Sequence, residues 1–176
     1  MKRVRSNLTL WQRAMASLVW GCCRLIGAMP HWLRYYVLQD TIYFIVYKCL
    51  RYRVGVVTEN LRNSFPERSE RDLHRICCLY YRNLTEQIIN IISQSGISDD
   101  ELRRRIRFNN VEQVMREVGQ RNAIFMTAHY GSWEAGSTIS LTARDHTFVA
   151  AYHKIEDPVF DELMKRIRQH TNVKLV

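Results

Sequence analysis

The sequence predicts an α/β protein in which N-terminal, membrane-associated helices precede a sheet built from alternating strands and helices. Two observations carry this prediction. Basic residues mix with large apolar ones over residues 1–53, and short extended and helical patterns alternate from residue 106 onward. A chain of 176 residues can form one domain with a hydrophobic core. The change in composition after residue 53 divides the chain into two parts. Residues 1–53 form the membrane-associated helices, and residues 54–176 form the α/β part.

Positive charge is concentrated near the N-terminus. Residues 1–60 hold nine Lys and Arg residues against two acidic ones, so they carry seven of the nine net positive charges. These basic residues are interleaved with Trp, Tyr and long aliphatic side chains, a pattern that suits an anionic membrane surface. A nucleic-acid surface is the alternative, although the basic residues form no polar stripe. We expect a membrane partner and no nucleic acid.

Two helices are predicted in this basic region. Residues 11–29 repeat apolar side chains at steps of four and three, which places them on one face of a helix that Pro30 ends. Residues 35–53 are apolar nearly all round and rich in Tyr. No uncharged run approaches the ~20 residues that span a bilayer, so we expect both helices to lie in or dip into the interface. A charge-tolerant span and two buried helices are the alternatives. The predicted apolar face comprises Trp11, Met15, Leu18, Cys22, Leu25 and Met29.

The five cysteines fall as two adjacent pairs, Cys22-Cys23 and Cys77-Cys78, and the single Cys49. Adjacent cysteines fit neither the ligand spacing of a zinc site nor the disulfide framework of a secreted domain. We therefore expect reduced thiols in apolar surroundings, and chemistry that takes place on the cytosolic side of the membrane.

Helix signals precede the alternating region. Ser69 with Asp72 forms an approximate capping box for a helix that Gly96 stops, and Ser98 with Glu101 starts a shorter one. Strands that alternate with helices indicate a parallel sheet. The expected order is extended residues 106–108, a helix over 111–118 stopped by Gly119, a buried strand over 123–128, a helix over 132–143, a strand over 147–152, a helix over 157–170 with Pro158 near its start, and a strand over 172–176.

His129 and Glu134 form a candidate catalytic pair. His129 follows the predicted strand 123–128, and ligands gather at the carboxyl ends of parallel strands. Gly131 permits a tight turn that would place Glu134 in the first turn of the next helix. A carboxylate that accepts from one imidazole nitrogen leaves the other free as a general base. The alternative is a core histidine beside a glutamate at a helix N-terminus. A metal role is weaker, because no third ligand lies at a suitable spacing.

The residues HYGSWE, 129–134, resemble the H-x4-[DE] block of the lysophospholipid acyltransferase superfamily, and most closely its lipid A biosynthesis branch. Residues 52–73, with an asparagine-leucine pair and Phe-Pro-Glu, resemble the N-terminal half of that branch. Residues 151–176 resemble its next block. This chain has Ser132 where the block usually has Asn, and His153 at an arginine position. Members of the branch extend beyond Val176, so the chain is expected to be the N-terminal part of such an enzyme.

The resemblance implies an enzyme on the cytoplasmic face of the inner membrane of a Gram-negative bacterium. It would move a fatty acyl chain from acyl carrier protein or coenzyme A to a lipid hydroxyl, without a cofactor. His129 would be the base, Glu134 would orient it, and Arg168 would bind phosphate or stabilise an oxyanion. A non-catalytic membrane- or partner-binding fragment is the alternative. The expected substrate-binding residues are Gly131, Ser132, Trp133, His153 and Arg168.

Overall fold

The computed structural model describes residues 8–128, 130–171 and 173–176. Helices account for most of these residues, and one small sheet is present among them. The chain divides into two compact units, one formed by Met1–Ala28 with Ile91–Val176 and the other by Met29–Asn90. The predicted division at residue 53 concerns membrane association and stays a prediction.

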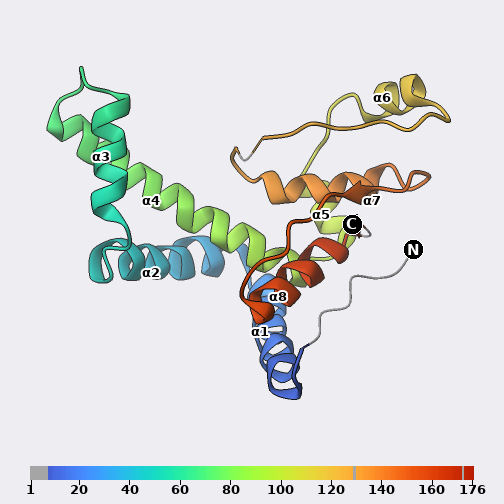
Figure 1. Cartoon of the computed structure of the whole chain (residues 1–176), viewed down its shortest axis with the longest axis horizontal. Helices are drawn as coiled ribbons and strands as arrows, with labels where there is room; N and C mark the ends of the chain where they lie inside the picture. Colours follow the sequence, from blue (N-terminus) through green and yellow to red (C-terminus); the bar gives the residue numbers. More distant parts are fainter. Residues whose placement is uncertain (1–7, 129, 172) are drawn as a thin grey trace. The chain divides into compact units, whose positions relative to one another are not determined.

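The unit Met29–Asn90 is helical. Residues Leu33–Leu38 (η1), Gln39–Tyr43 (α2) and Phe44–Cys49 (η2) follow one another as a helical run, which confirms the helix predicted in this region. Helices α3, Val54–Ser64, and α4, Glu70–Ser93, come next, and α4 belongs to this unit as far as Asn90. Figure 1 shows these helices in blue to green. Their core is centred on Tyr47, Cys77 and Tyr81, and Tyr47 and Tyr81 stack at 4.7 Å between ring centroids.

Local capping signals set the starts of two helices as predicted. The Ser69 hydroxyl accepts from the Asp72 N–H at 3.2 Å and donates to the Asp72 carboxylate at 2.7 Å, at the start of α4. Ser98 caps α5, Asp99–Arg105, by accepting from the Glu101 N–H at 3.3 Å. The cysteines are free thiols, and Cys23 and Cys77 are buried as predicted, whereas Cys22 and Cys49 are exposed and so lie outside the apolar surroundings that we expected.

In the other unit, helix α1, Leu10–Ala28, packs on α8, Pro158–Gln169 (Figure 1). The contact is a cluster of Cys23 with Leu163, Met164 and Ile167. The face of α1 that packs here is therefore not the predicted apolar face. Three residues of that predicted face, Trp11, Leu18 and Leu25, are 72%, 62% and 68% exposed. No helix in the described part of the chain combines the length and the hydropathy of a membrane span.

Two glycines allow the backbone of α1 to touch the residues that follow α4. A Cβ at Gly27 would lie 2.3 Å from the Ser93 carbonyl oxygen and 2.5 Å from the Gly96 Cα. A Cβ at Gly96, the last residue of η3 (Gln94–Gly96), would lie 2.2 Å from the Arg24 carbonyl oxygen. Since real Cβ atoms do not approach other atoms so closely, glycine is required at both positions for this contact.

Short helices lie between α5 and the sheet in the order of the chain. They are α6, Val111–Val118, which Gly119 ends as predicted, then η4, Trp133–Thr138, and α7, Ile139–Thr142. The last two lie within the helix predicted over 132–143. Ile97, Leu102 and Leu141 form a small cluster that joins α5 to α7.

The sheet pairs β1, Val149–Ala150, in parallel with β2, Lys174–Leu175, with Val149 opposite Lys174 and Ala150 opposite Leu175. The parallel strand–helix–strand order around α8 therefore confirms the prediction for this segment, although both strands are shorter than expected.

The buried strand predicted over 123–128 is wrong for this structure. These residues form no strand, and Ile124 and Met126 are 94% and 95% exposed. Figure 1 shows them within the long extended connection that follows α6. An apolar run becomes a buried strand only where a neighbouring strand accepts its backbone and helices cover its faces, and local sequence supplies neither condition.

Candidate active site

Glu134 lies at the start of η4, directly after a glycine turn. Gly131 has a φ of +57°, a left-handed conformation that glycine adopts without strain, which is consistent with the predicted tight turn. The Ala135 N–H then donates to the Ser132 carbonyl oxygen at 2.9 Å, which begins the helix. The Glu134 side chain is only 6% exposed. The other member of the predicted catalytic pair, His129, lies outside the residues that the structure describes.

Arg168, near the C-terminal end of α8, binds both carboxylate oxygens of Glu134. Its Nε donates to Oε2 at 3.0 Å and its Nη2 donates to Oε1 at 2.5 Å. The bidentate geometry matches the planar guanidinium to the planar carboxylate and makes this a strong ion pair. Hydrogen bonding to Glu134 raises the pKa of Arg168 above its ordinary value, against the opposing effect of burial. Arg168 therefore anchors the carboxylate for which the sequence predicts a catalytic role.

Two aromatic rings lie close to the same guanidinium group. The Arg168 Cζ is 5.5 Å from the centroid of the Trp133 ring and 5.2 Å from that of Tyr152. Both distances fall in the range of cation–π attraction, which strengthens where water is excluded. The candidate substrate residue Trp133 thus contacts Arg168, and the two predicted blocks meet at this point.

A second buried ion pair, Asp161 with Lys165, lies on α8, the helix that also carries Arg168. Asp161 is fully buried and accepts from the Lys165 Nζ at 2.6 Å. It also accepts from the Tyr152 hydroxyl at 2.5 Å and from the Ile155 N–H at 2.9 Å. Burial alone would raise the pKa of Asp161, but these hydrogen bonds outweigh it and hold the pKa below its ordinary value. Burial raises the pKa of Tyr152 to about 12, and the hydrogen bond to Asp161 is the second-largest cause of this shift.

The sequence-based prediction did not include Tyr152, Asp161 or Lys165. A signal was present, because Asp161, Lys165 and Arg168 are spaced at i, i+4 and i+7 and therefore share one face of a helix. The start of that helix agrees with the prediction. Asp157 accepts from the Phe160 N–H at 2.7 Å, and Pro158 is the first helical residue.

His153 does not join this cluster. It is exposed, whereas the neighbouring Tyr152 hydroxyl binds the buried Asp161. Successive side chains of an extended segment point to opposite sides, which accounts for the difference between these two residues. A substrate role for His153 stays a prediction, as it does for Gly131, Ser132, Trp133 and Arg168.

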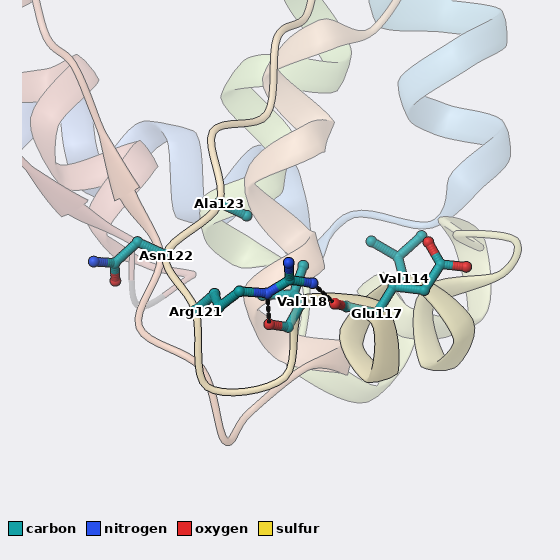
Figure 2. Close-up of a pocket in the computed structure, with 6 residues that line it drawn as sticks. All are labelled: Val114, Glu117, Val118, Arg121, Asn122 and Ala123. Carbon is teal, nitrogen blue, oxygen red and sulfur yellow. Dashed lines mark hydrogen bonds between the residues drawn. The ribbon is translucent and has the colours of Figure 1, made fainter.

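The chain also has an open hollow of about 300 Å³ at the C-terminal end of α6. Figure 2 shows Val114 and Glu117 on the helix, with Arg121 folded back towards it. Arg121 donates to the carbonyl oxygens of Val118 and Glu117, so it caps the end of α6. No predicted site residue lines this hollow.

Within residues 8–128, 130–171 and 173–176, no three His, Cys, Asp or Glu side chains are grouped so that they could hold a metal ion.

The similarity of this chain to known proteins lies at the level of a protein family. No curated protein and no solved structure gives a significant match. A family model does match: that of the bacterial lipid A biosynthesis acyltransferases, over residues 1–176. The chain therefore belongs to the bacterial lipid A biosynthesis acyltransferase family.

Proposed function

We propose that the protein transfers a fatty acyl chain from the thioester of acyl carrier protein or coenzyme A to a hydroxyl group of a lipid A precursor or a related lipid. Family membership supports an acyltransferase of lipid A biosynthesis. The observation that carries the proposal is the buried carboxylate of Glu134, which follows His129 at the spacing of the H-x4-E block and is fixed by Arg168. The thioester supplies an activated acyl group, so the proposed reaction uses no cofactor or metal.

In the proposed reaction, His129 removes the proton of the acceptor hydroxyl as that oxygen attacks the thioester carbonyl carbon. A carbon–oxygen bond forms, the carbon–sulfur bond breaks, and the proton passes from His129 to the departing thiolate. Glu134 accepts a hydrogen bond from the other ring nitrogen of His129, which fixes its tautomer. Each oxygen of Glu134 keeps lone-pair capacity after binding Arg168, so the carboxylate can serve both partners.

Arg168 has a second role in this proposal. Its Nε–H and one Nη2 N–H are committed to Glu134, so three of its five N–H groups can bind a phosphate or a developing oxyanion. Gly131, Ser132 and Trp133 contribute the turn next to this guanidinium, and His153 approaches the substrate from the surface. These substrate contacts are part of the proposal.

The proposed setting is the cytoplasmic face of the inner membrane of a Gram-negative bacterium. Trp11, Leu18 and Leu25 are exposed on α1 and recur every seven residues, which places them on one face of the helix. The exposed Arg13 and Arg24 lie on the same helix. Apolar and basic side chains together favour an anionic lipid surface, and the basic region also suits an acidic carrier protein. The proposal involves no nucleic acid.

The test is an assay of the full-length protein with labelled acyl carrier protein or acyl-coenzyme A and a lipid A precursor in vesicles. The proposal predicts acylated lipid with at least one donor, and a large loss of rate in Glu134→Gln. Glu162→Gln is the matched control, because Glu162 pairs at 3.0 Å with Arg166 on the same helix, away from Glu134. Vesicle binding without any transfer would instead favour a non-catalytic membrane-binding protein.

A further inference from the structure

Helix α8 has two buried faces of opposite character. Leu163, Met164 and Ile167 pack on α1 through apolar contacts. Another set of side chains on α8 is charged and also withdrawn from water: Asp161 and Lys165 are 1% and 5% exposed, and Arg168 is 20% exposed. Surface helices ordinarily direct charged side chains into water. The second buried face therefore needs an explanation beyond packing.

The charges on this face are fully compensated. Asp161 pairs with Lys165 and Arg168 pairs with Glu134, so the four groups sum to zero. Buried ion pairs are often no more stabilising than apolar residues of the same volume, because each charge is desolvated. What such an assembly does provide is a fixed geometry, since every charged group has one arrangement that satisfies it.

Tyr152 joins the two ion pairs. Its hydroxyl donates to Asp161 at 2.5 Å, while its ring centroid lies 5.2 Å from the Arg168 Cζ and 5.5 Å from the Lys165 Nζ. Asp161 also accepts from the Ile155 N–H, so the same carboxylate fixes the backbone that follows β1. The Tyr152 ring is thus held at its hydroxyl end by Asp161 and presents its face to Arg168.

We propose that Tyr152 and Asp161 are positioning residues that orient the Arg168 guanidinium, and through it the Glu134 carboxylate, for acyl transfer. The role rests on the proposed function. Glu134 fixes one edge of the guanidinium, and the rings of Tyr152 and Trp133 fix its plane. The directions of the three remaining N–H groups are then set before substrate binds. A misplacement of about 1 Å at such a site can reduce the rate about 100-fold.

The test is a double-mutant cycle on acyl transfer by the full-length protein, with kcat and KM measured for Tyr152→Phe, Arg168→Lys and the double variant. Tyr152→Phe keeps the ring and removes only the hydroxyl that binds Asp161, so folding is preserved better than in Asp161→Asn, which leaves Lys165 buried without its partner. We expect Tyr152→Phe to lower kcat about 10-fold. In the Arg168→Lys background, the same change should lower kcat less than about 2-fold, because Tyr152 acts through Arg168.

Additive effects, with Tyr152→Phe lowering kcat equally in both backgrounds, would overturn the positioning role while leaving the proposed function intact. So would a Tyr152→Phe protein that melts at a lower temperature but keeps the wild-type kcat and KM, since that is the signature of a structural role. A folded wild-type protein without transfer to any lipid would overturn the proposed function, and the positioning role with it. Glu162→Gln serves as the control for changes on α8.

Discussion

Arg168 and Glu134 form a bidentate ion pair across 34 residues of sequence, with N–O distances of 3.0 and 2.5 Å. The pair joins η4 to α8, and it brings the block that contains His129 together with the block that follows β1. Glu134 is 6% exposed and Arg168 is 20% exposed, so solvent screens the pair weakly. The carboxylate that would orient the base is thus held by a cation from a separate helix.

Replacement of Arg168 by Lys should weaken both stability and catalysis. Lysine keeps the charge but offers a single ammonium, which cannot bind both carboxylate oxygens in the same plane. We expect the free energy of unfolding to fall by about 1–3 kcal/mol. Urea titration followed by circular dichroism measures this change. Arg104→Lys is the control, because Arg104 is 74% exposed and its pair with Glu101 lies within one turn of α5, and it should shift the unfolding free energy by less than about 0.5 kcal/mol. Equal effects of the two substitutions would contradict a stabilising bidentate pair between Arg168 and Glu134.

The two substitutions Gly27→Ala and Gly21→Ala should have opposite effects on stability. A Cβ at Gly27 would lie 2.3 Å from the Ser93 carbonyl oxygen, whereas a Cβ at Gly21 meets nothing within 4 Å. Both residues lie in α1. We expect Gly27→Ala to cost about 3 kcal/mol or more, because backbone must move. Gly21→Ala should stabilise by about 0.5–1 kcal/mol through helix propensity. Thermal melting of both variants decides the point, and a neutral Gly27→Ala would show that α1 does not touch η3 in solution.

Acid should destabilise the fold partly through Asp161. The pKa of Asp161 is lower in the folded protein than the value of about 3.9 in an unfolded chain. Its contribution to the free energy of unfolding is therefore complete above about pH 4 and is lost as the pH falls through the folded-state pKa. Urea titrations between about pH 5 and pH 2 should show a shallower loss of stability in Asp161→Asn than in the wild type. Parallel curves would mean that Asp161 does not titrate in this way.

The exposed face of α1 should determine membrane binding. Burial of a large apolar side chain contributes about 1.5–3 kcal/mol, so the single changes Trp11→Ala, Leu18→Ala and Leu25→Ala should each weaken binding to phosphatidylglycerol-containing vesicles about 10-fold or more. Flotation assays measure this binding. Phe160→Ala is the control, because Phe160 is 50% exposed on α8, outside that face. A Phe160→Ala variant that binds as weakly as Trp11→Ala would contradict a specific role for α1.

Local signals in the sequence were enough to predict where several helices begin. The hydroxyls of Ser69 and Ser98 each satisfy an N–H three residues on, and Pro158 fits the first turn of a helix, so a few adjacent residues determine each outcome. The tight turn predicted at Gly131 depends on one residue in the same way, and Gly131 has a positive φ. The parallel pairing of β1 with β2 was also predicted, because alternating strands and helices favour a parallel sheet.

Features that depend on distant partners were not predictable in this way. The apolar residues 123–128 resembled a buried strand, yet Ile124 and Met126 are exposed, because burial requires neighbours that the segment does not encode. The spacing of Trp11, Leu18 and Leu25 identified an apolar face of α1 but not whether protein would cover it. The partner of Arg168 could not be inferred either, since a lone arginine on a helix fits a phosphate as well as a carboxylate.

The most direct test of the central claim is the rate of acyl transfer by His129→Ala, with its fold checked by circular dichroism. In the proposed function, His129 is the base that removes the acceptor proton, a step that contributes a factor of about 100–10,000 to rate. We therefore expect a folded variant that binds vesicles like the wild type and transfers acyl groups at least about 100-fold more slowly. A folded His129→Ala protein with undiminished transfer would contradict this role of His129.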